Sequence, residues 1–118
     1  MDHHRDPTNP AVLILKADAT LNTDSAESFL ADLEALIADG VRKAIVDCSD
    51  LEYISSYGIG LLLRAHKRLE RLNGEVKLAA VQPKARQALE LTKFDRVVSI
   101  HADLNLARQS CAPQAGAA

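Results

Sequence analysis

The sequence predicts an α/β fold in which helices pack on a parallel or mixed sheet. Two observations indicate this class. Short β-prone runs alternate with stretches of helical apolar spacing, in the order β, α, β, α, β, α, β, α. The links between them are only a few residues long, as is typical of helices that cover such a sheet. Because the chain has 118 residues, of which 47% are hydrophobic, we expect one domain with a substantial core.

Four short apolar runs predict the strands. They cover residues 12–15, 44–46, 76–81 and 97–100, and turn residues or charges flank them. Runs of this kind suit strands that are covered on both faces. We therefore expect a central sheet of about four to five strands.

Four other stretches predict about four helices. In the first, apolar residues at 26, 29, 30, 33 and 37 follow the spacing of one helical face, and Gly40 is placed to end the helix. The second has its apolar face at 59, 62, 63, 66 and 69 and ends at Asn73-Gly74. Pro83 opens a third helix, and Asp103 can cap a fourth that runs through Cys111.

The two ends of the chain lack these patterns. Residues 1–10 are polar, contain two prolines and follow neither period, which predicts a flexible N-terminal tail. Residues 111–118 include Pro113 and Gly116 among small residues, which predicts a disordered C-terminal tail. The single domain is therefore expected over residues 11–110.

Composition and charge argue against several classes of protein. The net charge is −2 and the chain has two Tyr, two Phe and no Trp, so it lacks the positive field and stacking surfaces of nucleic-acid binders. No apolar run approaches the roughly 20 residues of a membrane span, and the N-terminus does not resemble a signal peptide, so we expect a cytoplasmic protein. Cys48 and Cys111 follow no metal-binding spacing, and no metal site is expected.

The stretch 45–63 contains the most informative motif. Ser55 and Ser56 fall at the N-terminus of the second predicted helix, which begins near Tyr57. Unpaired backbone N–H groups and the helix dipole favour an anionic group at that position. Gly58 and Gly60 remove two side chains beside the serine hydroxyls, so another molecule could approach closely.

These residues alone leave several interpretations open. Either serine could simply cap the helix, a role worth about 1 kcal/mol relative to Ala. A catalytic serine is disfavoured because the Gly-x-Ser-x-Gly turn is missing and His66 falls on an apolar face, where a packed histidine is expected. A dinucleotide site is disfavoured because Leu63 replaces the third glycine of that fingerprint. We expect no enzymatic activity.

After the second predicted strand the chain reads Leu51-x-Tyr53-Ile54-Ser55-Ser56-x-Gly58-Ile59-Gly60-x-Leu62-Leu63. This pattern resembles the STAS domain of bacterial anti-sigma-factor antagonists. In that family a motif close to Asp-Ser-Ser-Gly-Leu-Gly follows a strand, and a partner kinase phosphorylates its first serine. When Gly58 and Gly60 are matched, that serine corresponds to Ser56. The resemblance extends from about Ala11 to Gln109.

The resemblance implies an STAS-like fold and a phosphorylation-switched binding module. The unphosphorylated protein would bind an anti-sigma factor with serine kinase activity and release the sigma factor, and phosphorylation on Ser56 would abolish binding. The kinase would carry ATP and magnesium, so the protein needs no cofactor of its own, and a cognate phosphatase would reset the switch. We expect a monomer or weak dimer, with neither nucleic acid nor membrane as partner.

Two positions depart from the family pattern. Acidic residues are frequent where this chain has Asn22 and Ser55, and these two residues keep hydrogen-bonding capacity but lose the charge. The kinase-recognition surface is therefore expected to differ. The expected partner-binding residues are Asn22, Ser55, Ser56, Tyr57, Gly58, Arg64, Lys67 and Arg68.

The second helix also has a basic stripe opposite its apolar face. Its members recur at i, i+3, i+4 and i+7 and are Arg64, Lys67, Arg68 and Arg71. Such a stripe can be an ordinary solvated face or can steer an acidic partner. Similar domains also serve as non-switching scaffold subunits of stressosome-type or lipid-transport assemblies, and this is the alternative function.

Overall fold

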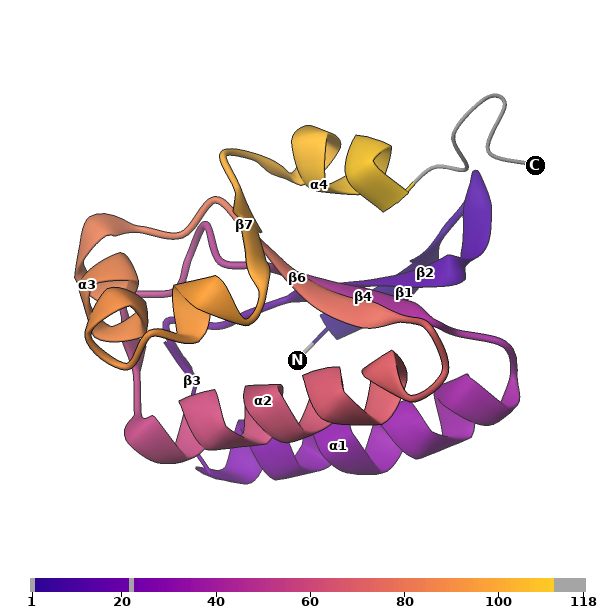
Figure 1. Cartoon of the computed structure of the whole chain (residues 1–118), viewed down its shortest axis with the longest axis horizontal. Coiled ribbons are helices and arrows are strands. Elements are labelled where there is room, and N and C mark those ends of the chain that lie inside the picture. Colours follow the sequence, from indigo (N-terminus) through magenta and orange to yellow (C-terminus); the bar gives the residue numbers. More distant parts are fainter. Residues whose placement is uncertain (1, 22, 112–118) are drawn as a thin grey trace.

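The fold is built on one mixed sheet of five strands. The computed structural model describes residues 2–21 and 23–111. The strand order is β1-β2-β4-β6-β7; β1 pairs antiparallel with β2, and the other neighbours pair in parallel (Figure 1). The strands of this sheet are β1 (Asp2–Asp6), β2 (Asn9–Lys16), β4 (Lys43–Asp47), β6 (Glu75–Ala79) and β7 (Ser99–His101).

Two short strands and the helices complete the described part of the chain. Strands β3 (Thr20–Leu21) and β5 (Tyr53–Ile54) form a separate parallel pair. The helices are α1 (Thr23–Ala38), α2 (Ser56–Glu70), α3 (Pro83–Leu91) and α4 (Leu104–Cys111), with a short 3-10 helix, η1 (Phe94–Arg96), after α3. The predicted α/β class, with a mixed sheet of four to five strands and about four helices, is confirmed.

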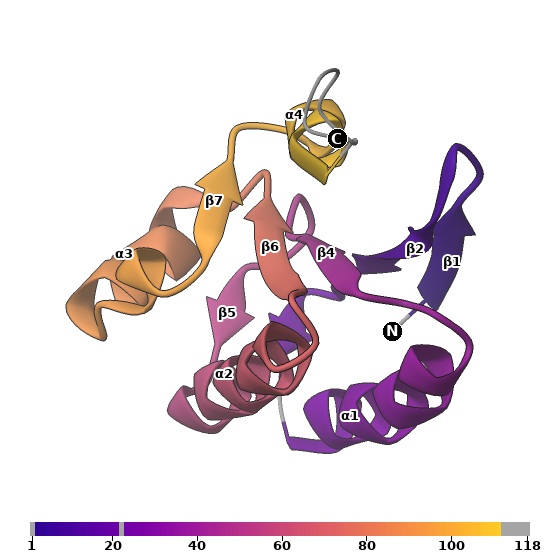
Figure 2. The ribbon, with the colours of Figure 1, turned by 45° about the vertical axis from the view of Figure 1, so that its right-hand side comes forward.

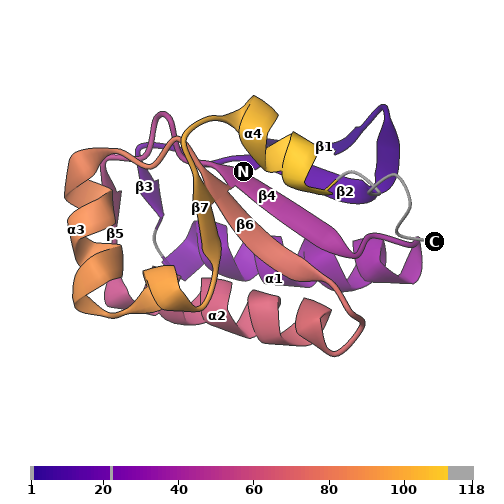
Figure 3. The same ribbon diagram turned by 45° about the horizontal axis from the view of Figure 1, so that its top comes forward.

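Helices cover both faces of the central sheet. α1 and α2 lie side by side along one face, as Figure 2 shows, and α4 lies over the opposite face (Figure 3). Because side chains alternate along a strand, Leu13 and Leu15 of β2 join the large apolar cluster beneath α1 and α2. Val12 and Ile14 join a smaller cluster beneath α4. β2 is therefore covered on both faces, as predicted.

The predicted flexible tail over residues 1–10 is wrong. Residues Asp2–Asp6 form the edge strand β1, and β2 begins at Asn9. Asp6 is only 3% exposed; it accepts hydrogen bonds from the backbone N–H and hydroxyl of Thr8 and forms a two-point ion pair with Arg108 on α4. Backbone pairing forms an edge strand without an apolar pattern, so these polar residues carry no strand signal.

The end of α2 confirms two other expectations. The helix ends at Glu70 and a turn follows through Asn73, whose φ is 63°, and Gly74. A Cβ at Gly74 would overlap the carbonyl of Arg42, so this close approach requires glycine. His66 is buried, and its Nδ1 accepts a hydrogen bond from the Val76 N–H at 3.1 Å. It is the packed histidine that was predicted.

At the C-terminal end, Cys111 is the last residue of α4 and is buried. The predicted disordered tail over 111–118 therefore begins too early at Cys111, and its other residues lie outside the described part of the chain. Among the residues that the structure describes, no helix combines the length and apolar character needed to cross a membrane.

Candidate functional site

Ser55 is the N-cap of α2. Its backbone is extended, with φ −77° and ψ 160°, and its Oγ accepts a hydrogen bond from the Gly58 N–H at 2.9 Å. This bond satisfies one of the N–H groups that have no partner within the first helical turn. The capping role left open for either serine therefore belongs to Ser55. The helix begins at Ser56, one residue before Tyr57.

Ser56, the first residue of α2, is exposed. It lines an open hollow of about 350 Å³ together with Tyr57, Gly60, Leu61 and Arg64. A negatively charged group on its hydroxyl would lie near the positive end of the helix dipole. The two adjacent serines thus differ in environment, because one caps the backbone and the other lines an open surface.

The two glycines have different positions. Gly58 is buried and donates its N–H to Ser55, which argues against the predicted contact of Gly58 with a partner. Gly60 is exposed and lines the hollow, and a Cβ added there would have nothing within 4 Å. The predicted partner-binding residues did not include Gly60, although its spacing of i+4 from Ser56 places both on one side of a helix.

Tyr57 connects the start of α2 to α1. Its hydroxyl donates a hydrogen bond to the carboxylate of Glu27 at 2.9 Å, and this carboxylate raises the pKa of the Tyr57 phenol. The residue remains 47% exposed, and Tyr53 on β5 is 61% exposed. Tyr57 lines the hollow at Ser56, whereas Tyr53 lines a separate hollow against α3. Exposed aromatic side chains are enriched at protein interfaces. The exposure of Tyr53 could not be predicted, because a two-residue strand has no periodicity.

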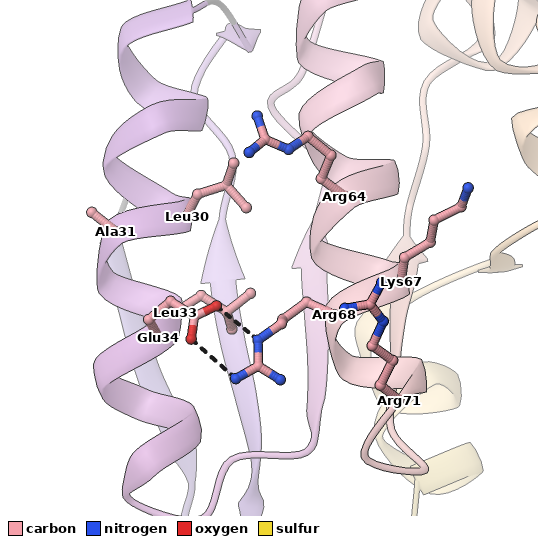
Figure 4. A pocket seen from close by; sticks show the side chains of 8 residues that line it. All are labelled: Leu30, Ala31, Leu33, Glu34, Arg64, Lys67, Arg68 and Arg71. Carbon is pink, nitrogen blue, oxygen red and sulfur yellow. Dashed lines mark hydrogen bonds and ion pairs between the residues drawn. The ribbon is translucent and has the colours of Figure 1, made fainter.

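The basic stripe of α2 borders a groove of about 540 Å³ between α1 and α2 (Figure 4). This basic groove is lined from α2 by Arg64, Lys67, Arg68 and Arg71, and from α1 chiefly by Leu30, Leu33 and Glu34. Arg68 forms a two-point ion pair with Glu34, at 2.9 and 3.2 Å. The other three cations form no ion pair with any residue that the structure describes.

The remaining site predictions concern Asn22 and metal or catalytic groups. Asn22, a predicted partner contact, lies outside the described residues. Within the described ranges, no group of three His, Cys, Asp or Glu side chains could hold a metal ion. His66 is buried, its Nδ1 accepts a hydrogen bond from the Val76 N–H, and its Nε2 lies 3.4 Å from Glu70 Oε2, so both ring nitrogens have partners other than Ser56.

The fold is that of a known domain family. The family model described as STAS domain matches residues 5–107, so the chain belongs to the STAS domain family. The match begins within β1, includes the Ser55-Ser56 turn and ends within α4.

Several known proteins resemble the chain. A relative from Bordetella bronchiseptica, named "Putative anti-sigma factor antagonist BtrV", is 32% identical over 83 residues, which cover 70% of this chain and 72% of the relative. A crystal structure of a Thermotoga maritima protein, described as a putative anti-sigma factor antagonist, has a TM-score of 0.81 at 24% identity. The match covers 92% of each chain. The unphosphorylated form of SpoIIAA has a TM-score of 0.78 at 18% identity, and the match covers 96% of this chain and all of SpoIIAA. The phosphorylated form of Bacillus SpoIIAA has a TM-score of 0.73 at 17% identity, and the match covers 94% of this chain and all of SpoIIAA.

Proposed function

We propose that this protein is an anti-sigma factor antagonist whose binding to its partner is switched by phosphorylation of Ser56. The observation that carries the proposal is the exposed Ser56 hydroxyl at the N-terminus of α2, within a STAS domain. The name of the BtrV relative supports the antagonist role. SpoIIAA, which has the same fold, has been solved in a phosphorylated form.

The unphosphorylated protein binds an anti-sigma factor with serine kinase activity, and this binding releases the sigma factor. The kinase supplies ATP and magnesium, and a cognate phosphatase removes the phosphate. The protein itself acts as a binding module and catalyses no step.

Ser56 is the better phosphate acceptor of the two serines. Its side chain is exposed and lines the hollow, where a kinase active site could reach it. The Oγ of Ser55 is partly buried and accepts the capping hydrogen bond from Gly58. Phosphorylation there would require that the cap be broken.

Phosphorylation should change binding and leave the fold intact. A phosphate on Ser56 adds about 1.5–2 negative charges at pH 7, and its interaction with the helix dipole is favourable by roughly 0.3–1 kcal/mol. Against a desolvated partner surface the same charges cost several kcal/mol. Each 1.4 kcal/mol or so weakens binding tenfold, so the partner is released from a folded domain.

The surface around Ser56 has the composition of a binding site. Tyr57 supplies an exposed aromatic ring, and Gly60 leaves open space in the same hollow. Aromatic anchors next to a concave region are typical of the residues that dominate binding energy. We infer that the partner contacts these residues directly.

The test is phosphopeptide mapping. The partner kinase is captured from native cytosol on the immobilised unphosphorylated protein and is then supplied with ATP and magnesium. We expect one phosphate, on Ser56, which Ser56→Ala abolishes. Ser55→Ala is the matched control, and it should still accept phosphate at Ser56. Phosphate on Ser55 alone, or full incorporation into Ser56→Ala, would contradict the proposal.

The switch itself is tested with Ser56→Asp. This substitution adds less charge and fewer acceptor oxygens than a phosphate, so a partial loss of kinase affinity is expected with little change in melting temperature. Ser56→Asn, which has a similar shape but no charge, is the control and should retain binding. Equal binding by both variants would show that charge at this position is not the signal.

A further inference from the structure

The basic groove contains positive charge that the rest of the described structure does not neutralise. Four of the 14 Lys and Arg of the chain lie within residues 64–71, although the net charge is −2. Glu34 pairs with Arg68, while Arg64, Lys67 and Arg71 form no ion pair with any described residue. Like charges at i+3 and i+4 on a helix repel one another. An anionic ligand in the groove would relieve that repulsion.

The groove also offers apolar surface between its charges. Leu33 is buried and Leu30 is partly buried, and both line the groove from α1. Arg64 and Arg68 reach across it toward α1, whereas Lys67 points away from that helix (Figure 4). The cations are therefore spread over roughly 10 Å of helix and do not converge on one point. This spacing suits several carboxylates on one face of a helix better than a single phosphate.

The groove adjoins the hollow at Ser56. Arg64 lines both the hollow at Ser56 and the basic groove. From Ser56 to the end of α2 the helix is roughly 22 Å long, at about 1.5 Å per residue. A partner helix of about four turns could therefore occupy the groove with one end next to the serine.

We propose that the basic groove is the docking site for an acidic amphipathic helix of the anti-sigma partner. Apolar residues of that helix would cover Leu30, and its carboxylates would pair with Arg64 and Arg71 and with Lys67 on the side of the groove away from α1. The identity of the partner rests on the function proposed above, whereas the chemistry of the groove does not depend on Ser56. Complementary charges of this kind chiefly increase the association rate, and salt weakens the effect.

The first experiment uses defined probes and needs no kinase. The 15N-labelled full chain is titrated with a 20-residue amphipathic helical peptide that has Glu on one face and Leu on the other. We expect amide shifts along α1 and α2 around the groove, and weaker binding as salt rises. The same peptide with Gln in place of Glu should bind at least tenfold more weakly.

A pair of charge reversals locates the binding. Lys67→Glu/Arg71→Glu should weaken binding of the acidic peptide at least tenfold. Both side chains are exposed, and no described residue pairs with them, so the fold should persist. Lys93→Glu/Arg96→Glu makes the same change in net charge at the two ends of η1. This variant should bind the peptide at least half as well as the wild type, because only the general field changes.

Other results would overturn the inference. It fails if the Gln peptide binds equally well, if the shifts lie outside α1 and α2, or if both double variants lose binding equally. It also fails if Mg-ATP or phosphatidylglycerol vesicles saturate the groove while the peptide does not. If the peptide binds as expected but no kinase phosphorylates Ser56, the proposed switch is wrong and the docking groove remains. If Ser56 is phosphorylated normally and the peptide does not bind, the docking groove is wrong and the proposed switch remains.

Discussion

On one face of the central sheet, α1 and α2 cover a continuous apolar cluster that includes Leu13, Leu15, Leu33, Leu62 and Leu69. On the other face, α4 alone covers a much smaller cluster beneath Ala107 and Cys111. The ion pair between Arg108 and Asp6 connects α4 to the edge strand β1. The first face is therefore held by apolar burial, and the second depends more on charge.

This difference indicates which surface of the molecule can hold a binding site. Because apolar burial stabilises α1 and α2 from beneath, their outer surfaces can carry exposed serine, tyrosine and unpaired cations at little cost to the fold. The apolar cluster of the α4 face is small, and Arg108 of this helix is paired with Asp6. Binding should therefore be tunable on the first face, whereas changes to the charges of the second should affect stability.

The largest expected effect is in the core beneath α2. Leu62 is 1% exposed, so Leu62→Ala should lower the free energy of unfolding by about 2–5 kcal/mol, the usual range for a large-to-small core substitution. Leu106 on α4 is 46% exposed, and Leu106→Ala is the matched control, with a loss of about 0.5 kcal/mol or less. Urea unfolding measures both. Equal losses would mean that the two faces do not differ as described.

The second prediction concerns pH and the α4 face. The Arg108 guanidinium and the Thr8 N–H lower the pKa of Asp6 from 3.8 to about 2. A carboxyl with a lowered folded pKa stabilises the protein above its unfolded pKa, and this contribution is lost as pH falls toward the folded value. The stability difference between wild type and Asp6→Asn should therefore be constant from pH 7 to 5 and shrink between pH 4 and 2.

This pH dependence is measured by urea unfolding at pH 7, 5, 3 and 2. Asp32→Asn, which neutralises an exposed carboxylate on α1, controls for the loss of one negative charge. Hydrogen exchange should show that β1 and α4 lose protection first in Asp6→Asn. A stability difference that does not change with pH would mean that the ion pair makes no contribution to stability.

The third prediction separates the two serines by stability. Ser55→Ala removes the cap on the Gly58 N–H and should cost about 1 kcal/mol. Ser56→Ala, at an exposed position, should change stability by less than about 0.5 kcal/mol. Urea unfolding of the two variants side by side is the measurement. If Ser56→Ala is the more destabilising of the two, the assignment of the cap is wrong.

The smallest expected effect is a gain in stability. Gly60 lies within α2 and has open space around its missing side chain, so Gly60→Ala should increase stability by up to about 1 kcal/mol. The added methyl group would project into the hollow at Ser56 and should weaken partner binding. Thermal unfolding and affinity are measured on the same preparation. Lower stability with unchanged affinity would show that Gly60 has a structural role.

Some of this site follows from the sequence because its cause is local. Helix periodicity predicted α2, its apolar face and the basic stripe, and the adjacent Ser55 and Ser56 at its start were recognisable from their position and from the family motif. The cap is local, because the Ser55 hydroxyl accepts its hydrogen bond from the Gly58 N–H three residues further along the chain. The two serines could not be told apart in this way, because both are suitable caps.

Other features depend on contacts between distant residues. Asp6 and Arg108 are 102 positions apart, and nothing in either neighbourhood indicates that they pair. β1 forms because its backbone pairs with that of β2. No side-chain period in the sequence predicts this pairing. Gly58 and Gly60 are the same type of residue in the same helix. Only the packing of α2 decides that Gly58 is buried and Gly60 is exposed.

The sequence by itself determined the alternation of strands β2, β4, β6 and β7 with the four helices, the apolar face of α2 and the placement of a serine pair at its start, since these depend on periodicity and local backbone preference. Only the tertiary structure decided that Arg64 and Arg68 face α1 across a groove and that Glu34 neutralises one of them. Charges on separate helices acquire a shared environment only when packing brings those helices side by side. For that reason a stripe that resembles an ordinary solvated face in the sequence becomes one wall of a groove in the fold.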